Sequence, residues 1–510
     1  MSDETVKLLI VLVYMAGLLG LGVYASRHVS DARDYFAANK TLGFWATSFS
    51  ARATGESAWL LLGLTGLGAT VGLHGMWIVL GETLGVGAAW LWMAKPFKRL
   101  TDSYDAITIP DYLEARFRDT QQRIRRVAAV VLVVFVTIYV SAQIDATGTA
   151  FESFLGWNYY VGALVGFAVV LVYITTGGFL AVAWSDVVQG SLMFVGLVVL
   201  PIAGVFVAGG PDVVVTNLTT IDPNLLSFSH GGWTTATVMS AIGGAMIGAG
   251  FLGSPQIFVR FIAMRSEKEI NRGALVAITW TILADSGAVL SGLLGRHLLT
   301  DAGQSVTAVL GNGGQDVLPL LVAHIFPVVI VGIYVAIVLS AIMSTVDSLL
   351  VMAASAVVRD WYQQVKNPDI SDLALTGLAR KVTVGLAIAA LLLSFTVAAV
   401  MPGRTVFWFV IFGWSGLAAT FCPTMILSLF WRGLTRRGVI AAMLTGFACV
   451  PLFRFVVFEI PDVGPTLEPL TELPPAFAFS LLAAWLASVT DPAKTQLAVE
   501  VTAELREARS

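Results

Sequence analysis

One short stretch, Ser50-Ala51-Arg52-Ala53-Thr54-Gly55-Glu56-Ser57, decides how this chain folds. It lies inside an apolar segment, residues 43–66, that is long enough to cross a lipid bilayer. A charged side chain at the centre of a bilayer costs at least ~2.5 kcal/mol, so such a group normally faces a protein interior or a water-filled path. Glycine also weakens a helix. The stretch therefore predicts an interrupted membrane helix that faces the inside of a bundle.

A second interrupted segment, Gly248-Ala249-Gly250-Phe251-Leu252-Gly253-Ser254-Pro255, follows five predicted spans later. Its glycines weaken the helix, and its proline removes a backbone donor. Transporters bind cations at carbonyl groups that such breaks expose. Two breaks at this spacing predict two five-helix repeats, residues 43–209 and 233–430, that each begin with a broken helix. Close packing between helices is the other explanation for these glycines.

The composition places the whole chain in a membrane. Of its 510 residues, 57% are hydrophobic and only 12% are charged, and the mean hydropathy is +0.82. Soluble domains carry about twice that share of charge. The net charge of −3 carries little information in a membrane protein, and the sequence shows no basic patch for nucleic acid. Cys422 and Cys449 lie in separate apolar runs, so we expect neither a disulfide nor a zinc site.

We predict an all-α membrane protein, with residues 1–510 as a single transporter domain. About thirteen segments can cross some 30 Å of hydrocarbon. They lie near 6–25, 43–66, 72–95, 127–147, 158–177, 186–209, 233–256, 273–296, 320–348, 381–401, 406–430, 437–457 and 471–490. The segment 6–25 would be an extra N-terminal helix, 437–490 would hold two C-terminal helices, and 491–510 would form a tail.

The distribution of basic residues predicts the orientation, because Lys and Arg are held on the cytoplasmic side. With the N-terminus outside, only Lys7, Arg296, Arg404 and Arg454 of the 30 Lys and Arg residues fall in outer loops. The tail 491–510 is then cytoplasmic. Acidic residues precede Lys7 and no cleavage site follows, so the first segment is expected to be retained. We expect a multi-pass protein of the cell inner membrane.

Seven ionisable residues lie inside the predicted spans: Arg52, Glu56, Glu82, Asp145, Asp186, Asp285 and Asp347. Arg52 and Glu56 are four residues apart, so they meet on one helix face and could neutralise each other. We favour buried hydrogen-bonded or interface roles for Glu82 and Asp285. Asp186 and Asp347 have hydroxyl neighbours, which form the oxygen-rich setting that hard cations prefer. With Ser348, they are a candidate second cation site.

The family resemblance rests on six motifs taken together: Asp34-Tyr35-Phe36, Ser57-Ala58-Trp59-Leu60-Leu61, Ile109-Pro110-Asp111-Tyr112-Leu113, the run from Gly177 to Gly190, Val259-Arg260-Phe261, and Leu339-Ser340-Ala341-Ile342-Met343-Ser344-Thr345. With these motifs the chain resembles the sodium/solute symporters, and most of all their sodium/proline branch. The resemblance implies thirteen helices, a ten-helix inverted-repeat core and alternating access around a central site.

The resemblance also implies the binding residues. Sodium would be the coupling ion, held by the carbonyl groups of Ala53, Glu56 and Ala341 and by the hydroxyls of Ser344 and Thr345. The spacing of Ala341, Ser344 and Thr345 independently puts them on one helix face. The substrate, proline or a similar small molecule, would contact Ser57, Ala58, Trp59, Tyr139 and Phe251. No cofactor is implied.

Two departures from the sodium/proline branch keep alternatives open. That branch has an aspartate where this chain has Gly55, and here the acid is Glu56, one position later. Ile247, Phe251 and Ser254 replace its aromatic and glutamine residues at the second break. The alternatives are proton coupling through Glu56 or Asp145, another amino acid or a monocarboxylate as substrate, and a membrane sensor that binds solute without moving it.

An enzyme is not expected. The sequence contains no Walker loop, nucleophile elbow or metal-ligand cluster. About twenty residues follow the last predicted span, which leaves no room for a nucleotide-binding or sensor output domain. The oligomeric state does not follow from the sequence.

Overall fold

The computed structural model describes residues 2–27, 38–174, 178–367 and 369–509. Asp34-Tyr35-Phe36 and Gly177, two parts of the resemblance, lie outside these ranges. Within them the chain is helical, and its one recorded β-bridge joins Leu42 to Met264. Among the described residues, ten helices are long and apolar enough to span a membrane, or eleven if one bent pair counts as a span. The prediction of an all-α membrane protein is confirmed at this level.

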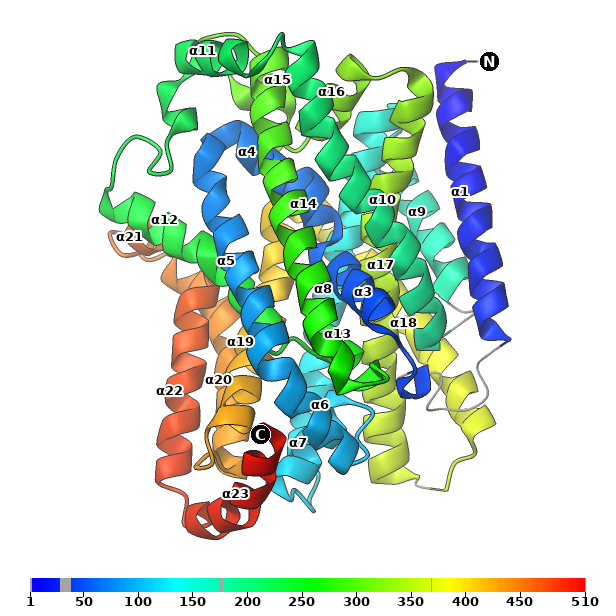
Figure 1. The fold of residues 1–510 in the computed structure, drawn as a ribbon, viewed down its shortest axis with the longest axis vertical. Helices are drawn as coiled ribbons and strands as arrows, with labels where there is room; N and C mark the ends of the chain where they lie inside the picture. The colour runs from blue at the N-terminus through cyan, green and yellow to red at the C-terminus, as the bar shows by residue number, and fades with distance from the viewer. Residues whose placement is uncertain (1, 28–37, 175–177, 368, 510) are drawn as a thin grey trace.

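The first half of the chain runs as follows: α1 (Asp3–Ser26), η1 (Ala38–Lys40), α3 (Phe44–Ala58), η2 (Trp59–Leu64), α4 (Thr65–Val71), η3 (Gly72–Gly75), α5 (Met76–Ala88), η4 (Ala89–Met93), α6 (Ala94–Ser103), α7 (Ile109–Phe117), α8 (Arg123–Leu155), α9 (Tyr159–Ile174), α10 (Gly178–Val207), α11 (Pro211–Ile221) and η5 (Pro223–Leu226). The continuous apolar stretch Phe44–Ser103 turns back at Gly72, whose φ is +61°. Figure 1 shows α4 at the top of this turn and α5 running down beside it.

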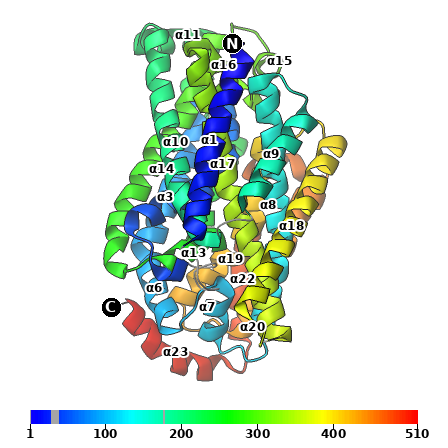
Figure 2. The same ribbon diagram turned by 90° about the vertical axis from the view of Figure 1, so that its right-hand side faces the viewer.

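The second half comprises α12 (Thr235–Met246), η6 (Ile247–Leu252), α13 (Pro255–Ala263), η7 (Glu267–Glu269), α14 (Ile270–Leu299), α15 (Val306–Leu310), η8 (Asn312–Gly314), α16 (Val317–Ile325), α17 (Val328–Ser355), η9 (Ala356–Lys366), α18 (Asp372–Val400), α19 (Val406–Phe430), α20 (Arg436–Leu452), η10 (Phe453–Val457), α21 (Gly464–Leu467), η11 (Glu468–Leu470), α22 (Leu473–Val489) and α23 (Lys494–Arg509). The N-terminus and α11 lie at one end of the bundle, and α7 and α23 lie at the other (Figures 1 and 2).

Both predicted helix breaks are present. In α3, Ser57 has a φ of +53° and a ψ of −167°, which no α-helix allows. The second segment becomes a 3₁₀ helix at Ile247–Leu252, and α13 then begins at Pro255. A proline is tolerated at this first helical position because its missing N–H has no partner there. Each break therefore falls where the glycines and the proline interrupt the apolar run.

Some predicted boundaries were wrong. The span predicted at 320–348 begins at Val328, since Pro327 separates α16 from α17. The predicted tail contains a helix, α23, whose end contacts the body through a hydrogen bond from Arg99 Nη1 to the Ala508 carbonyl oxygen, 3.2 Å. This helix ends in a basic turn with Arg506 and Arg509. Short amphipathic helices of this kind give a weak apolar signal in a sequence.

The bundle has inner and outer helices. In the most apolar window of α19, 89% of residues are buried, whereas the corresponding figure is 28% for α1 and for α18. Large apolar side chains on the outside remain exposed, as Phe206 at 80% illustrates. Such a surface suits lipid. The inner helices α3, α8, α17 and α19 can therefore hold a binding site away from lipid.

Candidate functional site

The first break of α3 brings backbone oxygens against two hydroxyls of α17. Ser344 Oγ lies 3.0 Å from the Ala53 carbonyl oxygen and 3.1 Å from that of Ala341. Thr345 Oγ1 lies 3.2 Å from the Ala341 carbonyl oxygen and 3.2 Å from that of Thr54. All five residues are buried. The result is a compact set of uncharged oxygens, which is the ligand type that hard cations use.

The structure thus gathers four of the five predicted cation ligands: Ala53, Ala341, Ser344 and Thr345. The fifth predicted ligand, the backbone carbonyl of Glu56, stays a prediction, while the carboxylate of Glu56 forms an ion pair with Arg52 one helical turn earlier. The neutralisation expected from their spacing is confirmed. Sequence reasoning missed Thr54, whose carbonyl accepts a hydrogen bond from Thr345. Its position immediately after Ala53 in the broken helix was the available signal.

Gln143 of α8 holds the end of the first break. Its Oε1 accepts a hydrogen bond from the backbone N–H of Ala58, 3.2 Å, and its Nε2 donates to Ser57 Oγ, 3.3 Å. This amide satisfies backbone and hydroxyl groups that the break leaves without a regular helical partner. Gln143 was missed at the sequence level, although it is an amide inside an apolar span.

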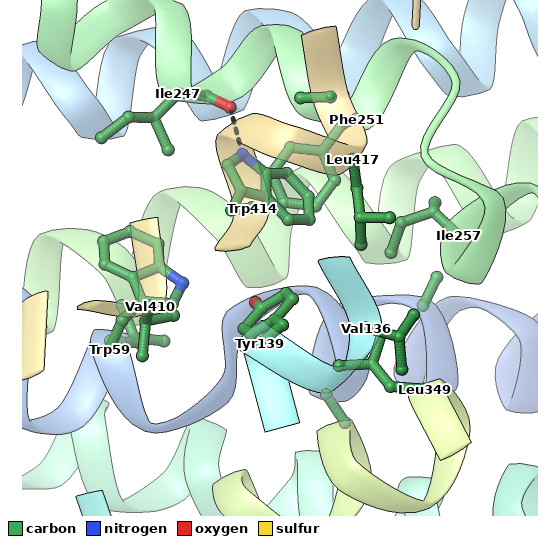
Figure 3. Close-up of a cluster of buried hydrophobic side chains, with 14 of the residues drawn as sticks. Trp59, Val136, Tyr139, Ile247, Phe251, Ile257, Leu349, Val410, Trp414 and Leu417 are labelled. Carbon is green, nitrogen blue, oxygen red and sulfur yellow. Dashed lines mark hydrogen bonds between the residues drawn. The ribbon is translucent and has the colours of Figure 1, made fainter. Parts of the chain in front are cut away.

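Aromatic side chains surround the region beside the two breaks (Figure 3). The ring of Trp414 of α19 packs at a tilt of 54° against that of Phe251, with centroids 5.0 Å apart, and meets Tyr139 edge-on at 6.5 Å. Its indole Nε1 donates to the Ile247 carbonyl oxygen, 3.0 Å, which fixes α19 against the second break. Trp59 lies at the other side of the group in Figure 3 and contacts Phe407. The predicted residues Trp59, Tyr139 and Phe251 therefore approach one region, and Trp414 is a further member that the sequence did not reveal.

The candidate second cation site already contains an arginine. Arg260 Nη2 lies 2.9 Å from Asp186 Oδ2 and donates to Ser348 Oγ at 2.6 Å and to Thr54 Oγ1 at 2.5 Å. Ser50 Oγ donates to the same Asp186 oxygen, 2.5 Å. Asp347 accepts from the Ser348 N–H through Oδ1, while its Oδ2 is buried without a hydrogen-bond partner among the described residues. The guanidinium of Arg260 thus supplies the positive charge beside Asp186.

Asp145, one of the residues proposed for proton coupling, is paired near the end of the bundle where α16 lies. Arg404 forms an ion pair with its carboxylate, and Tyr159 donates a hydrogen bond to Oδ1, 2.5 Å. At the other end, a small cavity of about 30 Å³ is lined by Ser348, Thr108 and Asp360 among others. Ser348, which lines this cavity, follows Ser344 and Thr345 by about one helical turn on α17, so the oxygen set lies beside the cavity.

A helical membrane bundle whose broken helices expose carbonyls to hydroxyls on a facing helix has the architecture of a cation-coupled secondary transporter. The sequence comparisons agree with this class. The model of the sodium:solute symporter family matches residues 35–446. This chain belongs to that family and is a multi-pass membrane transporter.

Three similar relatives are named as proline transporters. The chain is 35% identical to the high-affinity proline transporter PutP of Bacillus subtilis, over 94% of this chain and 97% of that protein. It is 33% identical to the osmoregulated proline transporter OpuE of the same organism over 86% of both chains. It is 31% identical to the sodium/proline symporter of Escherichia coli over 89% of both chains.

Solved structures share the fold. A Na⁺-coupled sialic acid symporter in a substrate-bound outward-open state superposes with a TM-score of 0.76 at 18% identity, covering 95% of this chain and 98% of that one. MhsT in complex with L-phenylalanine gives a TM-score of 0.52 at 15% identity, covering 87% of this chain and 98% of that one.

Proposed function

We propose that this protein is a sodium-coupled symporter that carries proline into the cell by alternating access. The observation that supports it most is the set of oxygens from Ala53, Thr54, Ala341, Ser344 and Thr345 at the first helix break. Five neutral oxygens suit a monovalent hard cation that must bind and then leave. The three relatives at 31–35% identity are named as proline transporters, which supports the substrate.

The proposed substrate position is beside this oxygen set. Trp59, Tyr139 and Phe251 could cover the apolar ring of proline, while Ser57 and Ala58 at the end of the broken helix could receive its polar groups. Tyr139 has a buried hydroxyl without a hydrogen-bond partner among the described residues, which makes it available to a bound solute. A different small solute remains the second candidate, because Gly55 and Phe251 depart from the sodium/proline branch.

We further propose thirteen spans with the N-terminus outside, the C-terminus in the cytoplasm and an inverted 5+5 repeat. The reversal at Gly72 divides Phe44–Ser103 into two crossings, and α9 and the bent helix pair ending in α22 would add two more to the ten long helices. The two breaks in α3 and before α13 support the repeat. The cavity from Ser348 to Asp360 would then be the cytoplasmic exit.

Asp186, Asp347 and Ser348 stay a proposed second cation site. Arg260 would have to share or release the Asp186 carboxylate before a cation could bind there, since both positive charges would otherwise compete for one oxygen. The buried Asp347 oxygen that lacks a partner supports the proposal.

The test is uptake of radiolabelled proline into proteoliposomes under an imposed sodium gradient, a proton gradient, or neither. We expect sodium-driven uptake that Ser344→Ala and Thr345→Ala abolish. Ser340→Ala is the matched control, because this serine is one turn away on α17 and bonds to Ala336 and Tyr14 instead. Uptake at the same rate with and without sodium would contradict the proposed sodium coupling. Preferential uptake of another solute in a competition panel would contradict proline as the substrate.

A further inference from the structure

A separate cluster of four ionisable side chains joins three helices in the transport core. Arg52 and Glu56 come from α3, Glu82 from α5 and Asp285 from α14, and none is more than 1% exposed. Arg52 Nη2 lies 3.4 Å from Glu82 Oε2 and 3.8 Å from Asp285 Oδ2, and it also pairs with Glu56. One guanidinium thus faces three carboxylates.

The charges of this cluster do not balance. Oxygens of the three carboxyl groups all lie within 4.8 Å of one another. Both oxygens of Asp285, and Nε and Nη1 of Arg52, are buried without a hydrogen-bond partner among the described residues. Carboxylates that share a buried site cannot all be ionised, because each charge loses its water and repels the next. The cluster lacks positive charge and a donor between its acids.

A bound proton would supply both the missing positive charge and the missing hydrogen-bond donor, and it needs no extra space. A metal ion at the centre would meet the Arg52 guanidinium, which already occupies it. That guanidinium is itself held between aromatic faces, 4.7 Å from the ring centroid of Phe251 and 5.3 Å from that of Trp280. A proton needs no cavity, since it converts one acid into a donor toward its neighbour.

We propose that Glu82 and Asp285 bind a proton between them, so that one carboxylic acid O–H donates to the other carboxylate, and that this proton-binding site is distinct from the sodium site on α3 and α17. The proton comes from water and returns to water when the acids are exposed. With one proton bound, the cluster keeps two negative charges against Arg52. Without it, three carboxylates repel one another across α3, α5 and α14.

The surrounding elements add little charge. Among the described residues, only Arg52 and Glu56 face the Glu82 and Asp285 pair directly, and the buried phenol of Tyr139 on α8 is the next titratable group. The elements η6, α12, α4 and η4, which pack nearby, carry no ionisable side chain. On the other neighbouring elements, Asp186 pairs with Arg260, Glu267 with Arg99, and Glu269 with Arg265. Asp347 on α17 and Arg296 on α14 keep buried polar atoms without a hydrogen-bond partner among the described residues, and no ion pair joins either one to Glu82 or Asp285 there.

The direct experiment is infrared spectroscopy of the purified full-length protein across a pH series. We expect an absorption from a protonated carboxyl group at neutral pH, with a component that disappears in Glu82→Gln and in Asp285→Asn. Asp285→Glu should retain it. Asp145→Asn is the matched control, because this buried aspartate is already paired with Arg404 and Tyr159, so its removal should leave the absorption unchanged.

A transport assay provides a second test of the proposed proton-binding site. Uptake by the natural sequence should fall as the pH rises above neutral, because loss of the shared proton leaves three carboxylates that repel one another across α3, α5 and α14. Asp285→Asn should flatten this dependence. A protonated-carboxyl absorption that is unchanged in both variants, or a Glu82 and Asp285 component that is lost when sodium alone is added, would overturn the proposal. The infrared arm needs no transport, so its failure is distinguishable from a failure of the sodium/proline assignment.

Discussion

At the scale of single residues, the absence of a side chain at Gly55 leaves room for the ring of Phe251. A Cβ atom on Gly55 would lie 2.7 Å from Phe251 Cε1 and 3.4 Å from Ile257 Cδ1. The ring of Phe251 is 2% exposed, packs against Trp414 and covers Arg52, so it has no free space to move into. The ring of Phe251 therefore fits only because position 55 carries no side chain.

This pairing predicts the effect of adding one methyl group. We expect Gly55→Ala to destabilise the protein by about 1–3 kcal/mol, because the added atom overpacks the core. In the double variant Gly55→Ala with Phe251→Ala, the cost should be smaller than the sum of the two single costs. Thermal unfolding of the solubilised protein measures the loss of stability in each variant.

Gly385→Ala provides the control for that series. Gly385 is in α18 with nothing within 4 Å of its added Cβ, so the substitution should be neutral or slightly stabilising. Strict additivity of Gly55→Ala and Phe251→Ala would show that the two positions do not interact.

At the scale of elements, an ion network ties α7 to α8 and η9. Asp111 of α7 accepts a hydrogen bond from Arg359 Nη1 at 2.7 Å and from Arg125 Nη2 at 2.8 Å. Its side chain also closes the capping box with Thr108 at the start of α7. Burial acts to raise the pKa of Asp111, but Arg359 and Arg125 outweigh burial and lower the pKa to about 2.

The low pKa of Asp111 predicts a pH dependence of stability. An unfolded aspartate has a pKa near 3.9, so the ionised form is favoured by folding and contributes about 2 to 3 kcal/mol above pH ~4. That contribution should be lost as the pH falls through about 2. Asp111→Asn should remove it at neutral pH and flatten the acid limb of an unfolding curve.

Asp102→Asn is the comparison for this network. Asp102 pairs with Lys40 and Lys98, but its side chain is 47% exposed, so water screens the pair and the loss should be within ~1 kcal/mol. Equal losses in the two variants would argue against a special role for the α7 network.

At the scale of the whole molecule, the proposed orientation can be tested with cysteines. Cys422 is fully buried and Cys449 is 9% exposed, so the natural sequence should label weakly. We expect Asp301→Cys, in the exposed loop after α14, to react with an impermeant maleimide on intact cells. Ala503→Cys, on α23, should react only after the cells are opened. The reverse pattern would invert the topology.

The sequence by itself determined the membrane class, the all-α fold, both helix breaks and most of the oxygen set. The membrane class, the all-α fold and the helix breaks follow from local properties, namely apolar length and the placement of glycine and proline. The oxygen set was implied by the family resemblance, and the i, i+3, i+4 spacing of Ala341, Ser344 and Thr345 agrees with it. The Arg52 and Glu56 pair was also predictable, since both members are on one helix.

Only the tertiary structure decided which distant groups meet. Gln143 at the first break, Trp414 at the second, Arg260 beside Asp186, and Glu82 against Asp285 each join helices far apart in the chain. Helical periodicity tells which face is buried, but it does not tell which neighbour that face will contact. Inter-helix contacts depend on how the helices pack around one another, and that is why the charge balance of the core became visible only in the folded protein.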